Sequence, residues 1–384
     1  MNKNKKIVII VNDLNFFISH RLPIAEALLH KGFKVSIGYG NLGEVDIQQL
    51  EQRGFSLSFI PLHRGSINLF KEIKTFFFIW KFIAKEKPIL AHFVTIKPYL
   101  YGGIVSRIKG VKCVVSAVSG LGSLFINNKL KIKFLRFVLF ILFKIALNHN
   151  NQKVIFHNQE DLRFLVSWGV LNQKKANIIK GSGVKLKDFT NLDEPKGTPV
   201  ICFAARLLRD KGIYEYFLAA KLLKQRGIKA EFLIVGDLDT KNPSGLNKSE
   251  LNNLKNEKIV KILGYEKDIP KLYARSNIIC LPSYREGLPK SLIEAAAASR
   301  AVVTTDVPGC RDAIIPNRTG ILVPVRDYQK LADALQWLIE NPNERISMGK
   351  EGRKFAEKEF PIETIVQKHI DIYQELIEKI IIYS

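Results

Sequence analysis

The chain has 384 residues, of which 47% are hydrophobic, and a formal net charge of +23 from 59 Lys and Arg against 36 Asp and Glu. This length suits two domains, and four scattered cysteines without a C-x-x-C pair argue against a disulfide framework or a zinc knuckle. The charge is uneven, because residues 1–190 hold 29 basic and 10 acidic residues, whereas residues 191–384 hold 30 and 26. The first half is therefore expected to attract an anionic partner: nucleic acid, an anionic lipid surface or a phosphorylated substrate.

Both halves of the chain open with the same order of elements. An apolar run at 7–11 is too short for the core of a signal peptide and predicts a strand, which a helix at 21–32 and a strand at 34–40 follow. The second half repeats this order of strand, helix and strand at 199–207, 213–227 and 230–237. Apolar strands that alternate with amphipathic helices indicate parallel sheets covered on both faces. The sequence thus predicts an α/β chain of two Rossmann-like, doubly wound domains.

The boundary between these domains is predicted in the polar segment FTNLDEPKGTP at 189–199, which contains Pro, Gly and Asp. The first domain is expected to span 1–190 and the second 191–365, with a C-terminal helix at 366–384 that packs back toward the first domain. A cleft between the two domains is the expected ligand site.

Two segments of the first half, 69–87 and 129–147, are both apolar and basic. On a helical wheel, four basic side chains of the second segment fall within about 80° of one another. They are Lys129, Lys133, Arg136 and Lys144. Such a stripe suits a helix that lies in an anionic membrane interface, although a core helix with one solvated face has the same pattern. Because these charges interrupt the longest apolar stretch, we expect a peripheral protein on the cytoplasmic face of the membrane and no spanning helix.

Neither half carries a familiar nucleotide-binding fingerprint. The first strand of each half is followed by NDLNFF or ARLLRDKG, so G-x-G-x-x-G is absent from both places, and no P-loop motif occurs. A dinucleotide cofactor is therefore disfavoured. Ligands of such folds still bind at the carboxyl ends of the strands, where helix N-termini offer N–H groups to anions.

The stretch REGLPKSLIEAAAAS at 285–299 follows an apolar strand and begins a helix. Pro289 suits the first helical position, so a diphosphate at this helix start would meet backbone N–H groups and the side chain of Lys290. Glu294 would then accept hydrogen bonds from ribose hydroxyls, and Glu286 would face the group attached to the diphosphate. The alternative is that Glu286 is a solvated loop residue and Glu294 an ordinary helix-surface charge.

A second pair of charges follows another predicted strand end. Arg206 and Lys211, in AARLLRDKG, are two cations five residues apart in a strand-to-helix loop, which suits a diphosphate clamp. The same stretch taken alone would also fit a surface turn.

Together these motifs resemble the family 4 retaining glycosyltransferases, which have the GT-B fold, and the resemblance covers nearly the whole chain. Its marks are EGLPKSLIE at 286–294, RLLRDKG at 206–212, FLIVG at 232–236 and LGYEKDIPKLYARSNIICLPS at 263–283. The resemblance implies a nucleotide-diphospho-sugar donor bound mainly by the second domain, and transfer of its sugar with retention of anomeric configuration.

The resemblance also implies a role for each motif residue. Arg206 and Lys211 would hold the diphosphate, Glu294 the ribose, and Glu286 the sugar and leaving group. The remaining donor-binding residues would be Gly287, Leu288, Pro289, Lys290, Gly236, Tyr265 and Gly183. No metal or other cofactor is expected, because the cations and the helix start stabilise the departing diphosphate. Asp237 and Asp239 form a D-x-D, the metal-binding mark of a different glycosyltransferase fold, which we interpret as a chance match.

The acceptor is suggested by the segment at 92–125, which resembles family members that build oligosaccharides on undecaprenyl diphosphate. A diphosphate with a polyprenyl tail would also suit a basic and apolar first domain. His20, Arg21 and His92 are the candidate acceptor-binding residues, although His20 equally fits a packing or capping role. The chain departs from the family pattern in three places: the loop AVSGLG lacks a histidine, no Gly-Gly pair follows the first strand, and GSGVK at 181–185 has Ser and Lys where the family's N-G-V-D element has Asn and Asp.

The combined expectation is a peripheral glycosyltransferase that transfers a sugar, expected to be an N-acetylhexosamine, from a UDP-sugar to an undecaprenyl-diphosphate-linked glycan of a surface polysaccharide. One alternative is a GT-B sugar-nucleotide epimerase, which needs neither a lipid nor a basic face. The other is a nucleic-acid-binding protein, suggested by the net charge. Binding of nucleic acid is not expected, because the basic stretches carry no zinc, helix-turn-helix or RNP-like signature.

Overall fold

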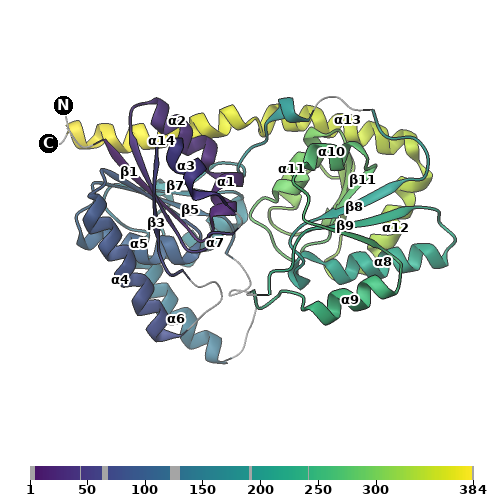
Figure 1. Ribbon diagram of the computed structural model, residues 1–384, viewed down its shortest axis with the longest axis horizontal. Helices are drawn as coiled ribbons and strands as arrows, with labels where there is room; N and C mark the ends of the chain where they lie inside the picture. Colours follow the sequence, from purple (N-terminus) through teal and green to yellow (C-terminus); the bar gives the residue numbers. More distant parts are fainter. Residues whose placement is uncertain are drawn as a thin grey trace. The chain divides into compact units, whose positions relative to one another are not determined.

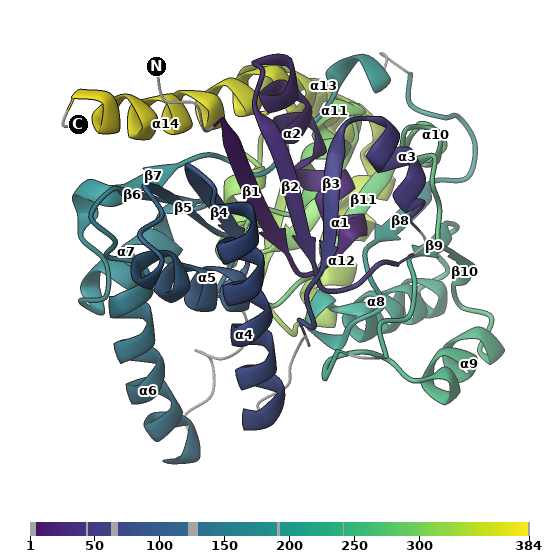
Figure 2. The same ribbon diagram turned by 60° about the vertical axis from the view of Figure 1, so that its left-hand side comes forward.

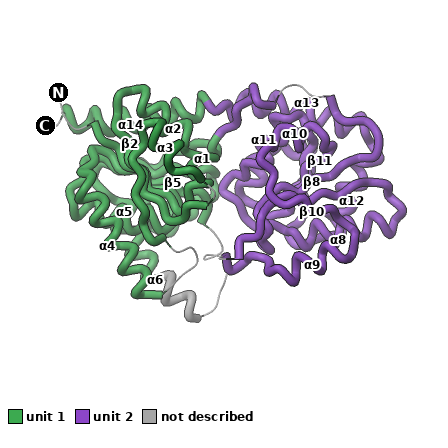
Figure 3. The backbone as a smooth tube through the Cα atoms, in the orientation of Figure 1, with its two compact units in different colours: residues 1–182, 363–384 green, residues 183–362 purple. Residues whose placement is uncertain are grey.

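The computed structural model describes residues 5–43, 45–62, 68–121, 130–189, 193–240 and 242–382, with the backbone alone for 130–136. The chain divides into two compact units, coloured separately in Figure 3. Unit 1 comprises Met1–Ser182 and Glu363–Ser384, and unit 2 comprises Gly183–Ile362.

Unit 1 is built on a parallel sheet with the strand order β3-β2-β1-β4-β5-β6-β7. Its strands are β1 (Lys6–Val11), β2 (Lys34–Tyr39), β3 (Phe55–Phe59), β4 (Leu90–Val94), β5 (Cys113–Val118), β6 (Gln152–Phe156) and β7 (Ala176–Ile178). The central strands are buried on both faces, which explains why their sequences are continuous apolar runs. All strands run parallel, but the order in which the chain adds them changes direction: β2 and β3 lie on one side of β1, and β4 to β7 lie on the other.

Helices cover both faces of this sheet (Figure 1). The first face packs against α1 (Leu14–His20), α2 (Leu22–His30), α3 (Ile47–Gln52) and α14 (Ile362–Ile382). The second face packs against α4 (Leu69–Glu86), α5 (Ile96–Ile108), α6 (Leu130–Ala146) and α7 (Gln159–Ser167). Figure 2 shows α4 and α6 extending on the same side of unit 1, and α5 packs against both.

The border between the units differs from the predicted one. Val184 and Phe189 are buried in the core of unit 2, so this unit begins at Gly183 rather than at residue 191. At the other end α14 begins at Ile362, and its apolar side chains, among them Ile365 and Leu376, are buried in the core of unit 1. Both ends of unit 2 are set by which neighbouring apolar side chains are buried, and in which core. The composition of the sequence alone does not reveal this burial.

Unit 2 has a parallel sheet with the strand order β10-β9-β8-β11-β12-β13. Its strands are β8 (Val200–Ala204), β9 (Glu231–Val235), β10 (Lys261–Gly264), β11 (Ile278–Leu281), β12 (Ala301–Thr305) and β13 (Gly320–Val323). Its helices are α8 (Ile213–Gln225), α9 (Lys248–Asn256), α10 (Ile269–Ala274), α11 (Lys290–Ala297), α12 (Tyr328–Glu340) and α13 (Pro342–Glu359). Short 3₁₀ turns occur in unit 1 at Gln173–Lys175 and in unit 2 at Leu186–Asp188, Arg209–Lys211 and Arg311–Ala313.

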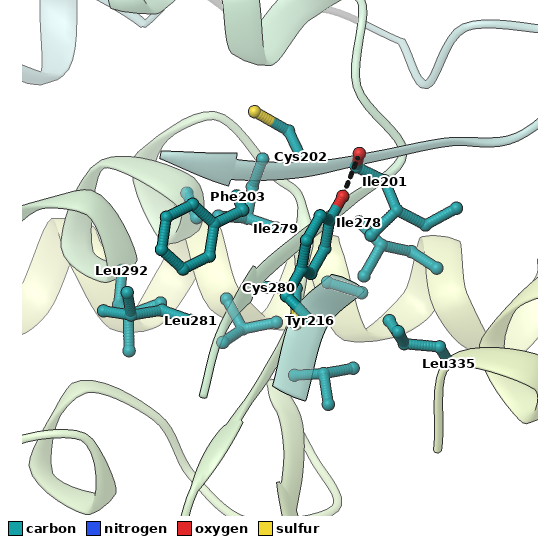
Figure 4. Close-up of a cluster of buried hydrophobic side chains, with 14 of the residues drawn as sticks. Ile201, Cys202, Phe203, Tyr216, Ile278, Ile279, Cys280, Leu281, Leu292 and Leu335 are labelled. Atoms are coloured by element: carbon teal, nitrogen blue, oxygen red, sulfur yellow. Dashed lines mark hydrogen bonds between the residues drawn. The ribbon is translucent and has the colours of Figure 1, made fainter. Parts of the chain in front are cut away.

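The core of unit 2 ties the first helix to the central strands. Figure 4 shows the Tyr216 ring of α8 among apolar side chains of β8 and β11, with its hydroxyl donating to the carbonyl of Ile201 over 2.8 Å. The same hydroxyl lies 3.1 Å from the carbonyl of Leu233 on β9. Tyr216 thereby attaches α8 to both β8 and β9, which helps to fix the loop between β8 and α8.

No helix among the described residues is long and apolar enough to cross a bilayer. Exposed apolar side chains nevertheless gather on α4 and α6. They are Leu69, Phe70, Ile73 and Phe77 on α4, and Phe137, Val138, Ile141 and Ile145 on α6. The predicted stripe of lysines lies mostly outside the description: Lys129 is not described, and for Lys133 and Arg136 only the backbone is.

A cluster of polar side chains is buried between α14 and the sheet of unit 1. Arg21 and His92 are 0% exposed, and His157, His369 and Tyr373 lie beside them. The Tyr373 hydroxyl and His92 Nδ1 share a hydrogen bond of 2.6 Å, and an Arg21 amino group lies 3.4 Å from His157 Nε2. His157 and His369 each place Nδ1 2.8 Å from a backbone carbonyl, which assigns the proton to Nδ1 in both neutral rings.

The histidines of this cluster are neutral because burial and the nearby guanidinium disfavour their protonated forms. Burial and Arg21 lower the pKa of His157 to about 4 and that of His369 to about 3. The same two causes, in the same order, place the pKa of His92 well below its ordinary value. The neutral rings leave Arg21 as the main cationic group of the cluster.

Acidification should therefore destabilise unit 1. The unfolded chain takes up protons on these histidines below about pH 6.5 while the folded chain does not, so stability falls as the pH drops from about 6.5 toward 4. Between pH 7.5 and 5.0, each histidine should cost about 2 kcal/mol of unfolding free energy. His369→Asn, which keeps a donor for the Ile365 carbonyl, should reduce this loss by about that amount. Urea unfolding followed by tryptophan fluorescence measures it, and His30→Asn, at an exposed position, is the control. An equal loss in all three proteins would contradict the expectation.

Candidate active site in unit 2

The candidate residues of unit 2 lie on two loops that leave neighbouring strands. β8 and β11 are adjacent, and the chain leaves β8 toward one edge of the sheet and β11 toward the other. Their carboxyl ends therefore form a topological switch point, the place where doubly wound sheets bind ligands. The loop at 205–212 follows β8 and carries Arg206 and Lys211, and the loop at 282–289 follows β11 and carries Glu286.

These two loops are joined by their backbones. The N–H of Tyr284 donates to the carbonyl of Asp210 over 2.8 Å, and the Ser283 hydroxyl donates to the same carbonyl over 3.0 Å. Gly212 has a φ of +76°, and a Cβ there would lie 2.0 Å from the carbonyl oxygen of Pro282. Only glycine permits this approach, so the loops are held together by a constraint that acts on the main chain.

Lys211 and Glu286 form an ion pair across the two loops. The Ser283 hydroxyl also lies 2.8 Å from the carboxylate oxygen of Glu286 that Lys211 contacts, so its one proton is shared between this oxygen and the Asp210 carbonyl. The Glu286 side chain is 11% exposed, so its carboxylate is held in one orientation rather than solvated as a free loop residue. Sequence reasoning identified both charged residues but missed Ser283, whose position three residues before Glu286 was the available signal.

The start of α11 carries the second glutamate. The helix begins at Lys290, and Pro289 is its N-cap rather than its first residue, because Pro289 has the extended ψ of 124°. Lys290 Nζ lies 3.5 Å from Glu294 Oε1, one turn into the helix. Burial raises the pKa of Glu294 and Lys290 lowers it, with burial the larger effect. Gly287 and Pro289 are buried and Leu288 packs on the core, which fixes the entry to the helix.

Arg206 is paired with a residue that we interpreted as part of a chance motif. Its guanidinium lies 2.6 Å from the carboxylate of Asp239, in the loop after β9. Gly236 begins this loop with a φ of +144°, and a Cβ there would lie 1.8 Å from the carbonyl oxygen of Ala205. Gly236 thus acts by letting the two loops meet, which is a steric role in addition to the predicted contact with the donor.

The other two predicted donor-binding residues lie further along the chain. The Gly236 N–H donates to the Gly264 carbonyl over 2.8 Å, so Tyr265, which is 61% exposed, follows a residue that touches this loop. Gly183 precedes Val184, which exchanges backbone hydrogen bonds with Phe360 and Ile362. The described contacts of this segment are therefore with the start of α14 rather than with the loops after β8 and β11.

The predicted acceptor residues all lie in unit 1, but they differ in accessibility. His20 is partly exposed, its ring stacks on Phe16 with centroids 4.2 Å apart, and its Nδ1 lies 2.7 Å from the Ser19 hydroxyl. Arg21 and His92 have no exposed surface and belong to the buried cluster under α14. In this arrangement an Arg21 amino group donates to the His20 carbonyl over 3.0 Å, which positions the junction of α1 and α2, and neither Arg21 nor His92 presents surface to a ligand.

Within the described ranges, no three metal-ligating side chains gather at one place. The loops and the start of α11 instead bring three cation–carboxylate pairs and backbone N–H groups to the carboxyl ends of the strands: Arg206 with Asp239, Lys211 with Glu286, and Lys290 with Glu294. Such a set can hold a diphosphate and stabilise the charge that forms when this group leaves.

Comparison with known families decides the class of the protein. Residues 184–355 match the family described as glycosyl transferases group 1, and residues 6–158 match the family described as glycosyl transferase 4-like. The chain belongs to these glycosyltransferases. The predicted family and the predicted α/β fold of two Rossmann-like domains are thereby confirmed, and the epimerase alternative has no support.

Named relatives of this glycosyltransferase come from bacteria. It is 28% identical to the N,N'-diacetylbacillosaminyl-diphospho-undecaprenol alpha-1,3-N-acetylgalactosaminyltransferase of Campylobacter jejuni, over 95% of this chain and 99% of the relative. It is 26% identical to the UDP-Gal:alpha-D-GlcNAc-diphosphoundecaprenol alpha-1,3-galactosyltransferase of Escherichia coli, over 83% and 84%. Among solved structures, Anabaena Alr3699/HepE in complex with UDP-glucose has the same fold, with a TM-score of 0.74 at 18% identity over 97% and 99% of the two chains.

The glycine contacts of this glycosyltransferase lead to a stability prediction. Gly236→Ala should lower the unfolding free energy by about 2–4 kcal/mol, because the new Cβ meets backbone atoms that cannot move aside. Gly227→Ala is the matched control, since Gly227 also has a positive φ of 76° but nothing lies within 4 Å of an added Cβ. It should cost only the roughly 1–2 kcal/mol of a left-handed backbone. Similar losses in urea unfolding of the two variants would contradict the steric argument.

Proposed function

We propose that this glycosyltransferase transfers a hexosyl unit, in particular an N-acetylhexosamine, from a UDP-sugar to an undecaprenyl-diphosphate-linked glycan, with retention of configuration. The observation that carries the donor assignment is that Arg206, Lys211 and Glu286 lie on the two loops that leave the switch point of unit 2, with Lys211 paired to Glu286 across them. The names of the two bacterial relatives support the acceptor assignment, because both relatives act on sugars linked to diphospho-undecaprenol.

In the proposed reaction, the bond between the anomeric carbon and the diphosphate oxygen breaks, a bond from this carbon to an acceptor hydroxyl oxygen forms, and the hydroxyl proton is released, while negative charge builds up on the departing diphosphate. Arg206, Lys211 and the N–H groups at the start of α11 stabilise this charge more in the transition state than in the bound donor. Glu286 is held by Lys211 and Ser283, so it can orient the sugar at the reacting carbon. Glu294, which is partly buried one turn into α11, accepts hydrogen bonds from the ribose hydroxyls. These groups need no metal ion to neutralise the leaving group.

The acceptor places the enzyme at a membrane surface. On α6 and the end of α5, a groove of about 570 Å³ is lined by Phe137, Phe140, Ile141, Ile145, Arg107 and Lys144. On α4, Lys81 lies 4.8 Å from the ring centre of Phe77. Apolar surface rimmed by cations suits the interface of an anionic bilayer. Peripheral attachment to the cytoplasmic face of the membrane is part of the proposal.

Calorimetric binding of UDP and GDP in EDTA tests the donor site. Wild type should bind UDP selectively, and Glu294→Gln should weaken UDP binding about tenfold, because a ribose contact with a charged acceptor is lost. Glu286→Gln should bind UDP as wild type does but lose at least a hundredfold in kcat, because the side chain faces the sugar rather than the nucleotide. Equal loss of affinity and turnover in both variants would refute this division of roles, and no binding of any nucleotide to wild type would refute the donor site.

Vesicle flotation tests the membrane surface. Phe137→Ser with Ile141→Ser should release the protein from vesicles of phosphatidylglycerol and phosphatidylethanolamine, because insertion of apolar side chains is lost. Leu218→Ser with Val325→Ser is the matched control, since these side chains of unit 2 are similarly exposed, at 39% and 41%. Retention of the first variant on the vesicles would exclude the α6 face as the attachment surface. Tight binding of duplex or single-stranded nucleic acid at physiological salt would instead assign the basic charge to a different partner.

A further inference from the structure

We propose that Asp239 is an internal counter-ion for Arg206, which the diphosphate of the donor must displace, and that this exchange sets the affinity for the nucleotide. The inference rests on the proposed function, because it concerns the same donor site. It assigns a role to a carboxylate whose D-x-D pattern suggests metal binding instead.

The position of Asp239 is fixed by the backbone on both sides of it. Beyond the sheet, Leu207 and Leu238 form a parallel bridge, and the Leu207 N–H donates to the Asp237 carbonyl over 2.9 Å. The loops after β8 and β9 thus continue the pairing of their strands for several residues. Arg206 comes directly before Leu207, and Asp239 comes directly after Leu238. The backbone pairing of the two loops therefore brings the two side chains together.

The far end of the loop is closed as tightly. A Cβ on Gly245 would lie 2.1 Å from the carbonyl oxygen of Asp239. The Arg209 N–H donates to the Ser244 carbonyl over 2.8 Å, and an Arg209 amino group donates to the Gly245 carbonyl over 2.7 Å. The Asp239 backbone therefore has little freedom, and its carboxylate is presented to Arg206 from a rigid support.

The two partners differ in exposure. The Arg206 side chain is 48% exposed, whereas the Asp239 side chain is 19% exposed. A ligand can therefore reach the guanidinium from solvent while the carboxylate remains behind it. The Lys211–Glu286 pair differs, because both side chains are mostly buried, at 20% and 11% exposed, and Glu286 is assigned to the sugar. Arg206 is thus kept in place by Asp239 until the diphosphate arrives.

A diphosphate competes well for such a cation. It carries more charge than one carboxylate and matches the planar guanidinium with two oxygens, whereas a partly exposed ion pair is weak. The carboxylate that is left behind then repels the bound diphosphate. Asp239 thus lowers the affinity for the nucleotide and favours release of the product UDP. A metal ligand at this position would do the opposite, because it would join the diphosphate to the protein through the ion.

The sign of the effect gives the test. Calorimetric titration with UDP at 50 mM salt, in EDTA, should show about threefold to tenfold tighter binding by Asp239→Asn than by wild type, and Asp239→Ser should behave alike. The advantage should shrink at 500 mM salt, where charges are screened. Asp333→Asn is the control: it breaks a similarly exposed ion pair, with Arg226 at 2.9 Å, on helices away from the strand ends. Its UDP affinity should equal that of wild type.

A double-mutant cycle shows whether the effect acts through Arg206. In the Arg206→Ala background, which itself should bind UDP weakly, Asp239→Asn should give less tightening than it gives in wild type. Unchanged or weaker UDP binding by both Asp239 variants, with wild-type binding intact, overturns the inference and leaves the donor site standing. Weaker binding that Mg²⁺ restores in wild type alone identifies Asp239 as a metal ligand and likewise overturns it. A wild type that binds no nucleotide at all overturns the donor site and the inference together.

Discussion

Close contact between backbones at the carboxyl ends of β8, β9 and β11 is the constraint on which the site in unit 2 depends. Gly212 and Gly236 allow their loops to approach neighbouring carbonyls more closely than any side chain permits, and the hydrogen bonds of Asp210 and Leu207 fix the result. The charged side chains of the site stand on this framework. Their mutual distances are therefore set by strand order and glycine contacts, and the charges themselves have only to occupy the places provided.

The electrostatic design of the site follows from that framework. Arg206, Lys211 and Lys290 are each paired with a carboxylate, that of Asp239, Glu286 and Glu294 respectively, so the site carries paired rather than isolated charges. Isolated cations at one edge of a sheet would repel one another and weaken the fold. Unit 1 stabilises a buried cation in a different way, because Arg21 is surrounded by neutral imidazoles and a tyrosine rather than by carboxylates. In both units a positive charge is stabilised by groups that come from distant parts of the chain.

Much of the fold was predictable because parallel sheets leave a strong signal in the sequence, in which apolar runs alternate with amphipathic helices. The observed strands and helices lie close to the ranges predicted from this pattern. The placement of Arg206, Lys211 and Glu286 after strands and of Glu294 near a helix start was predictable for a related reason, since strand ends and helix starts can be read from the sequence. The contact of Arg206 with Asp239 was not, because it depends on the register of two loops 33 residues apart. The burial of His92 was also hidden, because α14, which covers it, comes from the far end of the chain. The off-by-one position of Pro289 is the usual error at a helix boundary.

The division of the chain has a consequence for biosynthesis. Unit 2 is one continuous segment inserted into unit 1, whose final piece is α14. During translation, unit 2 has all of its residues once Ile362 has left the ribosome, whereas unit 1 still lacks the helix that supplies Ile365, Tyr373 and Leu376 to its core. Unit 1 contains the residues that are synthesised first, but it is the second of the two units to be completed. Until α14 has been made, the apolar face over β1 and β4 stays open, although every strand of unit 1 is already present.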